Sequence, residues 1–240
     1  MNKNTIKSPP RETIVGGTVD SIKNHGLFST FSSGCQYMWD AICDTYLDRK
    51  MGVRGTRRIP TEKLGHQTDE NHFHIASDYR TFKKIMKLID IDEDLDVFLD
   101  YGSGSGRILV LAGRLYRFRK IIGVELVEDM VELSRRNISN AIKTGNLKCE
   151  DIEVSHTDAS EYEIPEEVSI IYFYNPFSGS VLRKALRKIR KSIDNNPRKV
   201  TIIVKSPEHF EREADDFGWL VKQAVMGRGI RYSFNIYLAE

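Results

Sequence analysis

The sequence predicts an α/β fold: a seven-stranded, mostly parallel sheet with helices on both faces, a C-terminal antiparallel hairpin, and an N-terminal helical or irregular extension. Three observations predict it. Apolar, strand-like runs alternate with amphipathic helical stretches from residue 97 onward. A glycine-rich loop joins the first of these runs to the helix that follows it. The chain ends in two strand-like runs around a glycine turn, which is typical of a hairpin.

The N-terminal third is less regular. Residues 1–34 mix Pro, Gly, Ser, Asn and charged residues without sustained periodicity, so an irregular arm is expected. Apolar residues at helical spacing predict a helix over 37–47 that ends near Gly52. After an irregular basic stretch, a second helix is predicted over 77–89, with Ser77 as its N-cap.

The periodic region then supplies the sheet. Strands are predicted over 97–100, 121–125, 152–157, 169–174, 200–204, 219–225 and 230–238. Helices are predicted from 106, over 128–143 and over 180–193. Strands that alternate with helices in this way form right-handed crossovers and a parallel sheet covered on both faces. We expect one catalytic domain over 75–240, preceded by an N-terminal arm and helical lid over 1–74, with residues 35–80 closing over the site.

Composition excludes several classes of protein. The chain has 240 residues, of which 40% are hydrophobic and 29% charged, and its net charge is only +2, so bulk charge identifies no partner. Three widely spaced cysteines without a CxxC pair argue against a disulfide framework or a thiolate zinc site, and favour a cytoplasmic location. We expect no signal peptide and no membrane span, because no apolar run approaches the required length.

The glycine loop carries the first functional indication. It contains Gly102, Ser103, Gly104 and Gly106, between a predicted strand and a predicted helix, where a ligand can approach the backbone closely. A dinucleotide-binding fingerprint would place a glycine three residues after Gly104, but Arg107 stands there. The loop suits a ligand with an amino acid end rather than a diphosphate.

Two carboxylates flank this loop. Asp100 precedes it and can accept a hydrogen bond from a ligand ammonium. Glu125 ends the second predicted strand, where a carboxylate can accept both hydroxyls of an adenosine ribose. A ligand-free tight turn for the loop and a solvated strand end for Glu125 are the alternative interpretations.

With these features the sequence resembles the class I S-adenosylmethionine-dependent methyltransferases, which have a Rossmann-like sheet. In that family an acidic residue precedes the glycine loop, another ends the second strand and a third follows the third strand; Asp100, Glu125 and Asp158 match these positions. The resemblance implies S-adenosylmethionine as cofactor, with Asp158 bound to the adenine amine, Ala159 beside the ring, and Leu126 lining the site. Taken alone, Asp158 can equally cap a turn.

Asn175, Pro176 and Phe177 follow the fourth predicted strand, where this family places its reacting edge. The run is similar to the Asn-Pro-Pro-aromatic motif of amine-directed members, with one proline absent. Asn175 can accept a hydrogen bond from an amine nucleophile and orient its lone pair, and it would also contact the cofactor. It is otherwise a turn former before proline. Phe177 is expected to form a wall rather than to react.

A closer resemblance runs through Asp48–Val53, His74–Tyr79, the glycine loop and residues 122–126, and is to uncharacterised bacterial methyltransferases distantly similar to non-SET histone lysine methyltransferases. That group places an aromatic and a hydroxyl residue before the loop to close over the cofactor. His74 and Ser77 occupy those positions. His74 can hydrogen-bond or stack on the cofactor, or can simply pack.

The expected function is therefore methyl transfer from S-adenosylmethionine to an unidentified acceptor, with a small molecule or a protein side chain favoured. An NAD-linked oxidoreductase and a non-catalytic adaptor for RNA or protein are the alternatives. Basic residues on the helix over 180–193 could serve nucleic acid, which is not favoured, or form a solvated face. No metal site is expected, because His72 and His74 lack further ligands at suitable spacing. The oligomeric state is left open.

Overall fold

The computed structural model describes residues 27–54, 78–174, 177–226 and 233–240, with side chains omitted for 27–37 and 226. Contacts between Cα atoms divide the chain into two units, 1–43 and 44–240. Helix α2 begins in the first unit and ends in the second, and the fold and site described below belong to the second. The predicted boundary at residue 74 and the predicted lid over 35–80 stay predictions.

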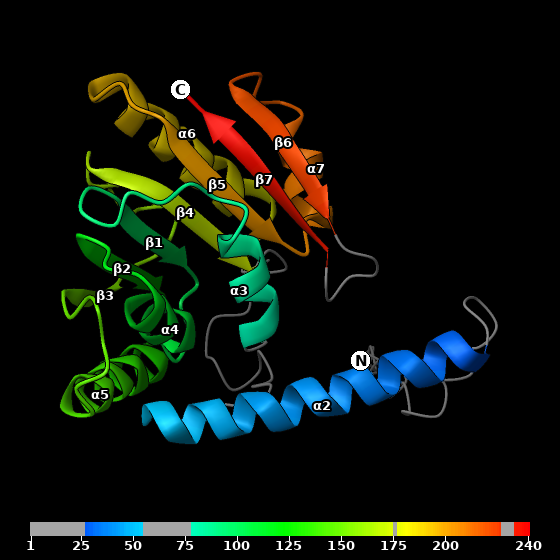
Figure 1. The fold of residues 1–240 in the computed structure, drawn as a ribbon. Helices are drawn as coiled ribbons and strands as arrows, with labels where there is room; N and C mark the ends of the chain where they lie inside the picture. The colour runs from blue at the N-terminus through cyan, green and yellow to red at the C-terminus, as the bar shows by residue number, and fades with distance from the viewer. Residues whose placement is uncertain (1–26, 55–77, 175–176, 227–232) are drawn as a thin grey trace, which may run out of the picture. The chain divides into compact units, whose positions relative to one another are not determined.

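The second unit is a seven-stranded sheet with helices on both faces (Figure 1). The strands are β1 (Val97–Tyr101), β2 (Lys120–Glu125), β3 (Ile152–His156), β4 (Val168–Tyr174), β5 (Val200–Lys205), β6 (Leu220–Met226) and β7 (Phe234–Ala239). The described helices are α2 (Leu27–Met51), α3 (Tyr79–Met86), α4 (Arg107–Leu115), α5 (Glu128–Lys143), α6 (Gly179–Asn195) and α7 (Glu208–Ala214). The predicted mostly parallel sheet is confirmed.

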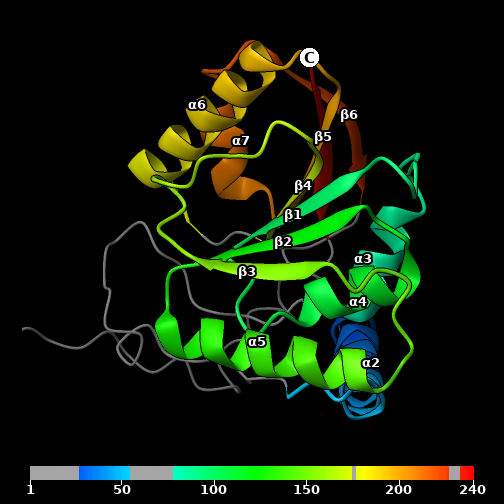
Figure 2. The same ribbon diagram turned by 90° about the vertical axis from the view of Figure 1, so that its left-hand side faces the viewer.

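The strand order is β3-β2-β1-β4-β5-β7-β6, with β7 antiparallel to both of its neighbours. The chain builds outward from β1 to β3, returns to the centre, and then builds from β4 in the opposite direction. Because parallel crossovers are right-handed, this reversal puts α4 and α5 on one face and α6 on the other (Figure 2). Ligands bind such sheets at the carboxyl ends of the strands where the order reverses, between β1 and β4 here.

Two apolar layers hold the helices to the sheet. One face of the sheet packs against α3, α4 and α5, and the other against α6 and α7. On the first face, Phe82 of α3 packs edge-on against Phe98 and Tyr172, with ring centroids 6.0 and 5.5 Å apart. The central strands β1, β4 and β5 are buried almost throughout, as their continuous apolar runs predict.

Several sequence-based boundaries were wrong. Helix α2 begins at Leu27, so the last part of the arm expected over 1–34 is helical, although the helix ends beside Gly52 as predicted. The cap of α3 is Asp78 rather than Ser77: its carboxylate accepts a hydrogen bond from the Thr81 amide at 2.7 Å. Helix α7 was not predicted at all.

The hairpin is antiparallel as predicted, but its second strand begins at Phe234 instead of residue 230. Its turn lies outside the described residues apart from Met226. No helix in the described part of the chain is long and apolar enough to cross a membrane.

Candidate cofactor site

The glycine loop connects β1 to α4 at the carboxyl end of the sheet. Gly102, Gly104 and Gly106 all have positive φ, of 72°, 54° and 73°, a conformation that side chains disfavour. The amides of Gly102 and Ser103 both donate to the carbonyl of Val124, at 2.9 and 3.1 Å. The loop is thereby folded over the end of β2, which explains why glycine recurs at these positions.

The loop is also closely packed from behind. A Cβ atom on Gly106 would stand 2.1 Å from Ser134 Oγ and 3.1 Å from Ser134 Cβ of α5, so a side chain there would force Ser134 to shift. The buried hydroxyls of Ser103 and Ser134 have no hydrogen-bond partner among the residues that the structure describes. An unpaired buried hydroxyl is costly, about 1–3 kcal/mol. Ser103, inside the loop itself, is therefore suited to a polar ligand that pairs with it.

Glu125 ends β2 beside this loop and is 9% exposed. Its carboxylate accepts hydrogen bonds from the amides of Gly104 at 2.8 Å and Val127 at 2.9 Å. Burial raises the pKa of the carboxyl, and these backbone donors partly oppose that shift. The carboxylate thus lies at the loop, with acceptor capacity beyond the two bonds that it already makes.

Asp100 lies one strand away, opposite Gly123 of β2, and is 3% exposed. Its pKa is raised well above the ordinary value, first by burial and then by the negative charge of Glu125. No cation of the described residues contributes an opposing effect to this pKa. The charge of Glu125 disfavours a charge on Asp100, so a ligand that brings a positive charge and several donors suits this pair of carboxylates.

The third acidic position lies after β3. The Asp158 carboxylate accepts a hydrogen bond from the Ser160 amide at 2.7 Å, and its carbonyl accepts from the amides of Glu161 and Tyr162 at 2.9 and 3.0 Å. Asp158 therefore caps a turn, and Ala159 is buried beside it. Nearby, the carbonyl of half-buried Leu126 lies 2.9 Å from His156 Nε2.

The reacting edge is described only in part. Asn175 and Pro176 lie outside the described residues, as do His74 and Ser77. Phe177 is 6% exposed and packs edge-on against Tyr101 and Phe173, with both centroid distances 5.9 Å. It is built into the core behind the end of β4, consistent with a wall.

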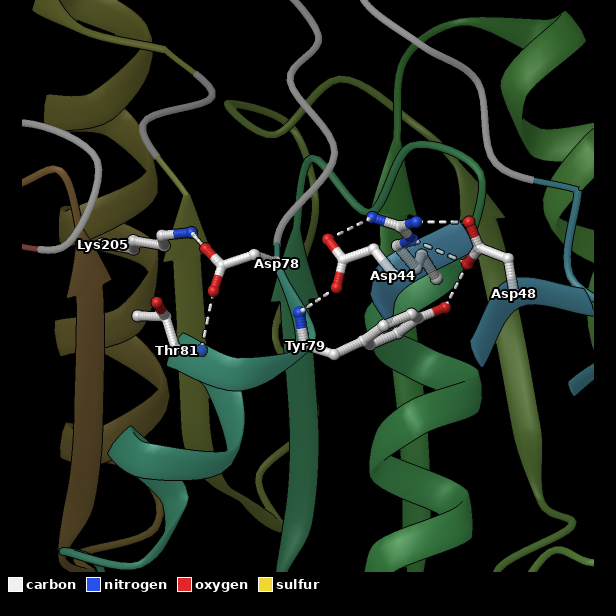
Figure 3. A network of polar contacts seen from close by, with 7 residues as sticks. Asp44, Asp48, Asp78, Tyr79, Thr81 and Lys205 are labelled. Atoms are coloured by element: carbon white, nitrogen blue, oxygen red, sulfur yellow. Dashed lines mark hydrogen bonds and ion pairs between the residues drawn. The ribbon is translucent and has the colours of Figure 1, made fainter. Parts of the chain in front are cut away.

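Sequence reasoning missed a buried polar network beside the site (Figure 3). Lys205 at the end of β5 has no exposed surface and forms an ion pair with Asp78, which is 1% exposed. Its ammonium lies 4.1 Å from the centroid of the Tyr174 ring, one residue before Asn175. The next residue, Ser206, has a φ of 53°, a left-handed value that is rare without glycine. The sequence feature that could have indicated this buried lysine is its position at the end of an apolar strand.

The second half of the network joins three helix ends. The guanidinium of Arg107, at the start of α4, pairs with Asp48 and Asp44 near the end of α2. The Tyr79 hydroxyl also donates to Asp48, and the Tyr79 amide donates to Asp44 at 3.2 Å. Two aspartates four residues apart on a helix were the sequence indication of one buried face.

The basic face of α6 proves to be paired with acids. Its members are Arg183, Lys184, Arg187, Lys188, Arg190 and Lys191. Five of the six form ion pairs, with Glu161, Glu163, Asp194, Glu213 or Asp216. The positive charge of this helix is therefore largely offset locally, which weakens the case for an RNA-binding adaptor. Within the described stretches, no group of three His, Cys, Asp or Glu residues could hold a metal ion.

Comparison with known proteins agrees with this geometry. The family model "Histone methylation protein DOT1" matches residues 76–217, more than half of the chain. A protein-lysine N-methyltransferase of Saccharolobus islandicus is 23% identical over 88 residues, which cover 37% of this chain and 54% of that protein. The chain thus matches about half the length of this curated relative.

Two solved structures are among those that this chain is similar to. A candidate S-adenosylmethionine-dependent methyltransferase from Methanococcus maripaludis is 16% identical, with a TM-score of 0.50, over 68% of this chain and 84% of that one. An RNA methyltransferase from Salinibacter ruber, in complex with S-adenosylhomocysteine, is 22% identical, with a TM-score of 0.47, over 69% and 92%. The oxidoreductase alternative is not favoured. With the glycine loop, the strand order and the family match together, the chain belongs to the DOT1 histone methylation protein family and has the class I methyltransferase fold.

Proposed function

We propose that this protein transfers a methyl group from S-adenosylmethionine to an amine of a protein side chain, in the first instance lysine. The observation that supports the cofactor best is the pair of buried carboxylates, Asp100 and Glu125, on either side of a loop with three left-handed glycines. The description of the family and the lysine-directed activity named for the Saccharolobus relative support the acceptor.

Each carboxylate suits one part of the cofactor. Asp100 is buried, and burial and the charge of Glu125 raise its pKa. It takes the ammonium of the methionine end, whose positive charge would stabilise the carboxylate. Glu125 takes the ribose hydroxyls, and the unpaired Ser103 hydroxyl takes a polar atom near the loop. Asp158 is assigned to the adenine amine, with Ala159 and Leu126 beside the ring. His74 and Ser77 are proposed to close over the cofactor.

The cofactor supplies an activated methyl group on a sulfonium, so the chain needs to orient the acceptor and exclude water. Phe177, packed against Tyr101 and Phe173, gives the acceptor side a fixed wall. Asn175 and Pro176, which continue from β4, are proposed to aim the amine lone pair at the methyl group. No covalent intermediate with the enzyme is required. A cytoplasmic location remains part of this proposal.

The cofactor assignment is tested by calorimetric titration with S-adenosylmethionine, S-adenosylhomocysteine and NAD. Wild type should bind the first two and not NAD. Glu125→Ala removes the acceptor for the ribose hydroxyls, so its affinity should fall by about tenfold or more, as expected for about 1.5–3 kcal/mol of charge-assisted hydrogen bonding. Glu163→Ala is the matched control, because that carboxylate is 65% exposed and pairs with Lys188 at the surface, so its loss should leave affinity unchanged. Binding of NAD alone would reverse the assignment.

The acceptor is tested with methyl-tritiated cofactor and three substrates: a lysine-rich histone fraction, the same fraction with its lysines chemically acetylated so that no nucleophilic amine remains, and total RNA. Label in the untreated histones that falls sharply after lysine blocking supports the proposal. Equal labelling of blocked and unblocked protein, or label only in RNA, would contradict it. Small amines added as competitors separate a protein acceptor from a small one.

A further inference from the structure

Residues 44–54 are linked to the glycine loop in two ways, directly through Arg107 and indirectly through Asn137, although they lie about fifty residues earlier in the chain. Arg107, the residue directly after Gly106, forms two contacts with the Asp48 carboxylate: Nε donates to Oδ1 at 2.9 Å and Nη2 pairs with Oδ2. Its Nη1 lies 3.4 Å from Asp44 Oδ2. A forked pair of this kind fixes orientation as well as distance.

The second attachment runs through Asn137 of α5. Its amide nitrogen donates to the carbonyl of Ser105, inside the loop, at 2.8 Å. The same side chain binds the backbone of Arg54 on both sides, accepting from the amide at 2.9 Å and donating to the carbonyl at 3.1 Å. The two residues that flank Gly106 are therefore both attached to one segment: Ser105 through Asn137, and Arg107 directly.

These attachments are buried and supported from below. Arg107 is 9% exposed, and its guanidinium lies 4.5 Å from the centroid of the Tyr79 ring, whose hydroxyl donates to Asp48. Asp48 is 8% exposed. Losing one partner of such a pair leaves a buried charge, so the loop cannot shift at Arg107 without a substantial cost.

The loop needs such a constraint. Gly106 is the N-cap of α4 and has a left-handed backbone conformation. Two residues earlier, the Gly104 amide donates a hydrogen bond to the Glu125 carboxylate. Glycine positions have wide conformational freedom, which must be lost before backbone amides can meet a ligand in one arrangement. A constraint built into the free protein lowers that cost when the ligand binds.

We infer that Arg107, Asp48 and Asp44 are positioning residues for the cofactor: the end of α2 holds Arg107, and Arg107 holds the glycine loop in its binding shape. This inference rests on the proposed function, since it concerns the same cofactor site. None of the three needs to touch the cofactor. The position that would carry glycine in a dinucleotide-binding loop is here used to attach the loop to residues 44–54.

The experiment measures S-adenosylhomocysteine affinity by calorimetry for wild type, Asp48→Asn, Asp44→Asn and Arg107→Lys. Asp48→Asn should weaken binding by about tenfold, the equivalent of about 1.4 kcal/mol. Asp44→Asn should weaken it less, because its contact is longer at 3.4 Å. Arg107→Lys keeps the charge but not the fork, so an intermediate loss is expected.

Two controls separate positioning from general destabilisation. Asp194→Asn removes the partner of Arg190 in an exposed pair on α6 and should leave affinity unchanged. Ile189→Val, in the apolar layer on the opposite face of the sheet, lowers stability modestly and should also leave the affinity of the folded protein unchanged. Wild-type affinity in a folded Asp48→Asn variant would overturn the inference, as would equal weakening in Ile189→Val.

A second measurement covers the case in which Asp48→Asn does not fold. In wild type, addition of S-adenosylhomocysteine should slow the hydrogen exchange of the loop amides and also that of residues 44–54. Both should slow because the contacts of Arg107 and Asn137 link the two segments. Slowing of the loop alone would overturn the inference. If wild type shows neither binding nor any change in exchange, the cofactor assignment itself fails, so the two failures are distinguishable.

Discussion

Replacing Lys205 with Met should destabilise the protein strongly at neutral pH. Lys205 has no exposed surface, and Asp78 is 1% exposed, so the pair is fully removed from water. Methionine replaces the apolar stem of the side chain but lacks the terminal ammonium and its charge. The Asp78 carboxylate would remain buried, with the hydrogen bond from the Thr81 amide still in place. Breaking a buried pair from one side costs about 3–5 kcal/mol, and we expect a loss in that range.

The stability lost in Lys205→Met should depend on pH, in a direction set by the pKa of Asp78. Burial acts to raise the pKa of the Asp78 carboxyl, but the charge of Lys205 and the hydrogen bonds from Lys205 and Thr81 hold it below the ordinary value. In wild type this carboxylate therefore adds stability above its unfolded pKa, and the contribution is lost as pH falls through the lower folded pKa. In Lys205→Met burial dominates and raises the pKa, so the defect should be largest at pH 7 and should shrink toward pH 4.

Urea denaturation followed by circular dichroism at pH 7 and pH 4.5 measures both effects. The double variant Lys205→Met with Asp78→Asn should regain more than half of the lost free energy, because no buried charge remains. Lys222→Met is the matched control: that lysine is 41% exposed and pairs with Glu211 at the surface, so its loss should cost under about 1 kcal/mol. A cost below about 1 kcal/mol for Lys205→Met at pH 7, or a cost independent of pH, would refute the reasoning.

Two further predictions follow from the loop and its attachment. Gly106→Ala should cost about 2–5 kcal/mol, the sum of about 1–2 for a left-handed backbone and about 1–3 for overpacking against Ser134, and should abolish cofactor binding in calorimetry. Gly145 has a similar positive φ, 66° against 73°, but open space where its Cβ would stand, so a thermal melt of Gly145→Ala should show only the smaller backbone cost; equal costs would contradict the packing argument. Burial raises the pKa of Asp44 to about 6, against the opposing charge of Arg107. Its contribution to stability is complete below the unfolded pKa and is lost as pH rises through about 6, so the stability of wild type relative to Asp44→Asn should fall between pH 4 and pH 7 in urea titrations; a constant difference would count against this shift.

The fold could be predicted because its strands are apolar runs of typical length and its loop follows the first of them. Prediction failed where local patterns are weak. The first half of α2 is rich in Ser, Thr and Gly, so propensity did not favour a helix there. Helix α7 has only seven residues, and four of them are charged, so its sequence resembles a loop. The start of β7 depends on pairing with β5, which no local pattern encodes.

The site divides in the same way. That Asp100 and Glu125 lie beside the glycine loop could be predicted, because the topology alone brings the strand ends together; their role in binding stays a prediction. The supporting network could not, because its partners are distant: Arg107 and Asp48 are 59 residues apart, and Lys205 and Asp78 are 127 apart. A charged residue in a sequence is by default a surface residue, and only the fold reveals which ones are enclosed.

The enclosed pair also constrains how this protein can change over evolutionary time. A substitution at either Lys205 or Asp78 alone passes through a chain with an unpaired charge in its interior, and a cost of several kcal/mol is a large part of the total stability of a domain. The two positions are therefore expected to be kept together or replaced together among descendants of a common ancestor. A substitution at one of the two positions is therefore not neutral while the other residue keeps its charge.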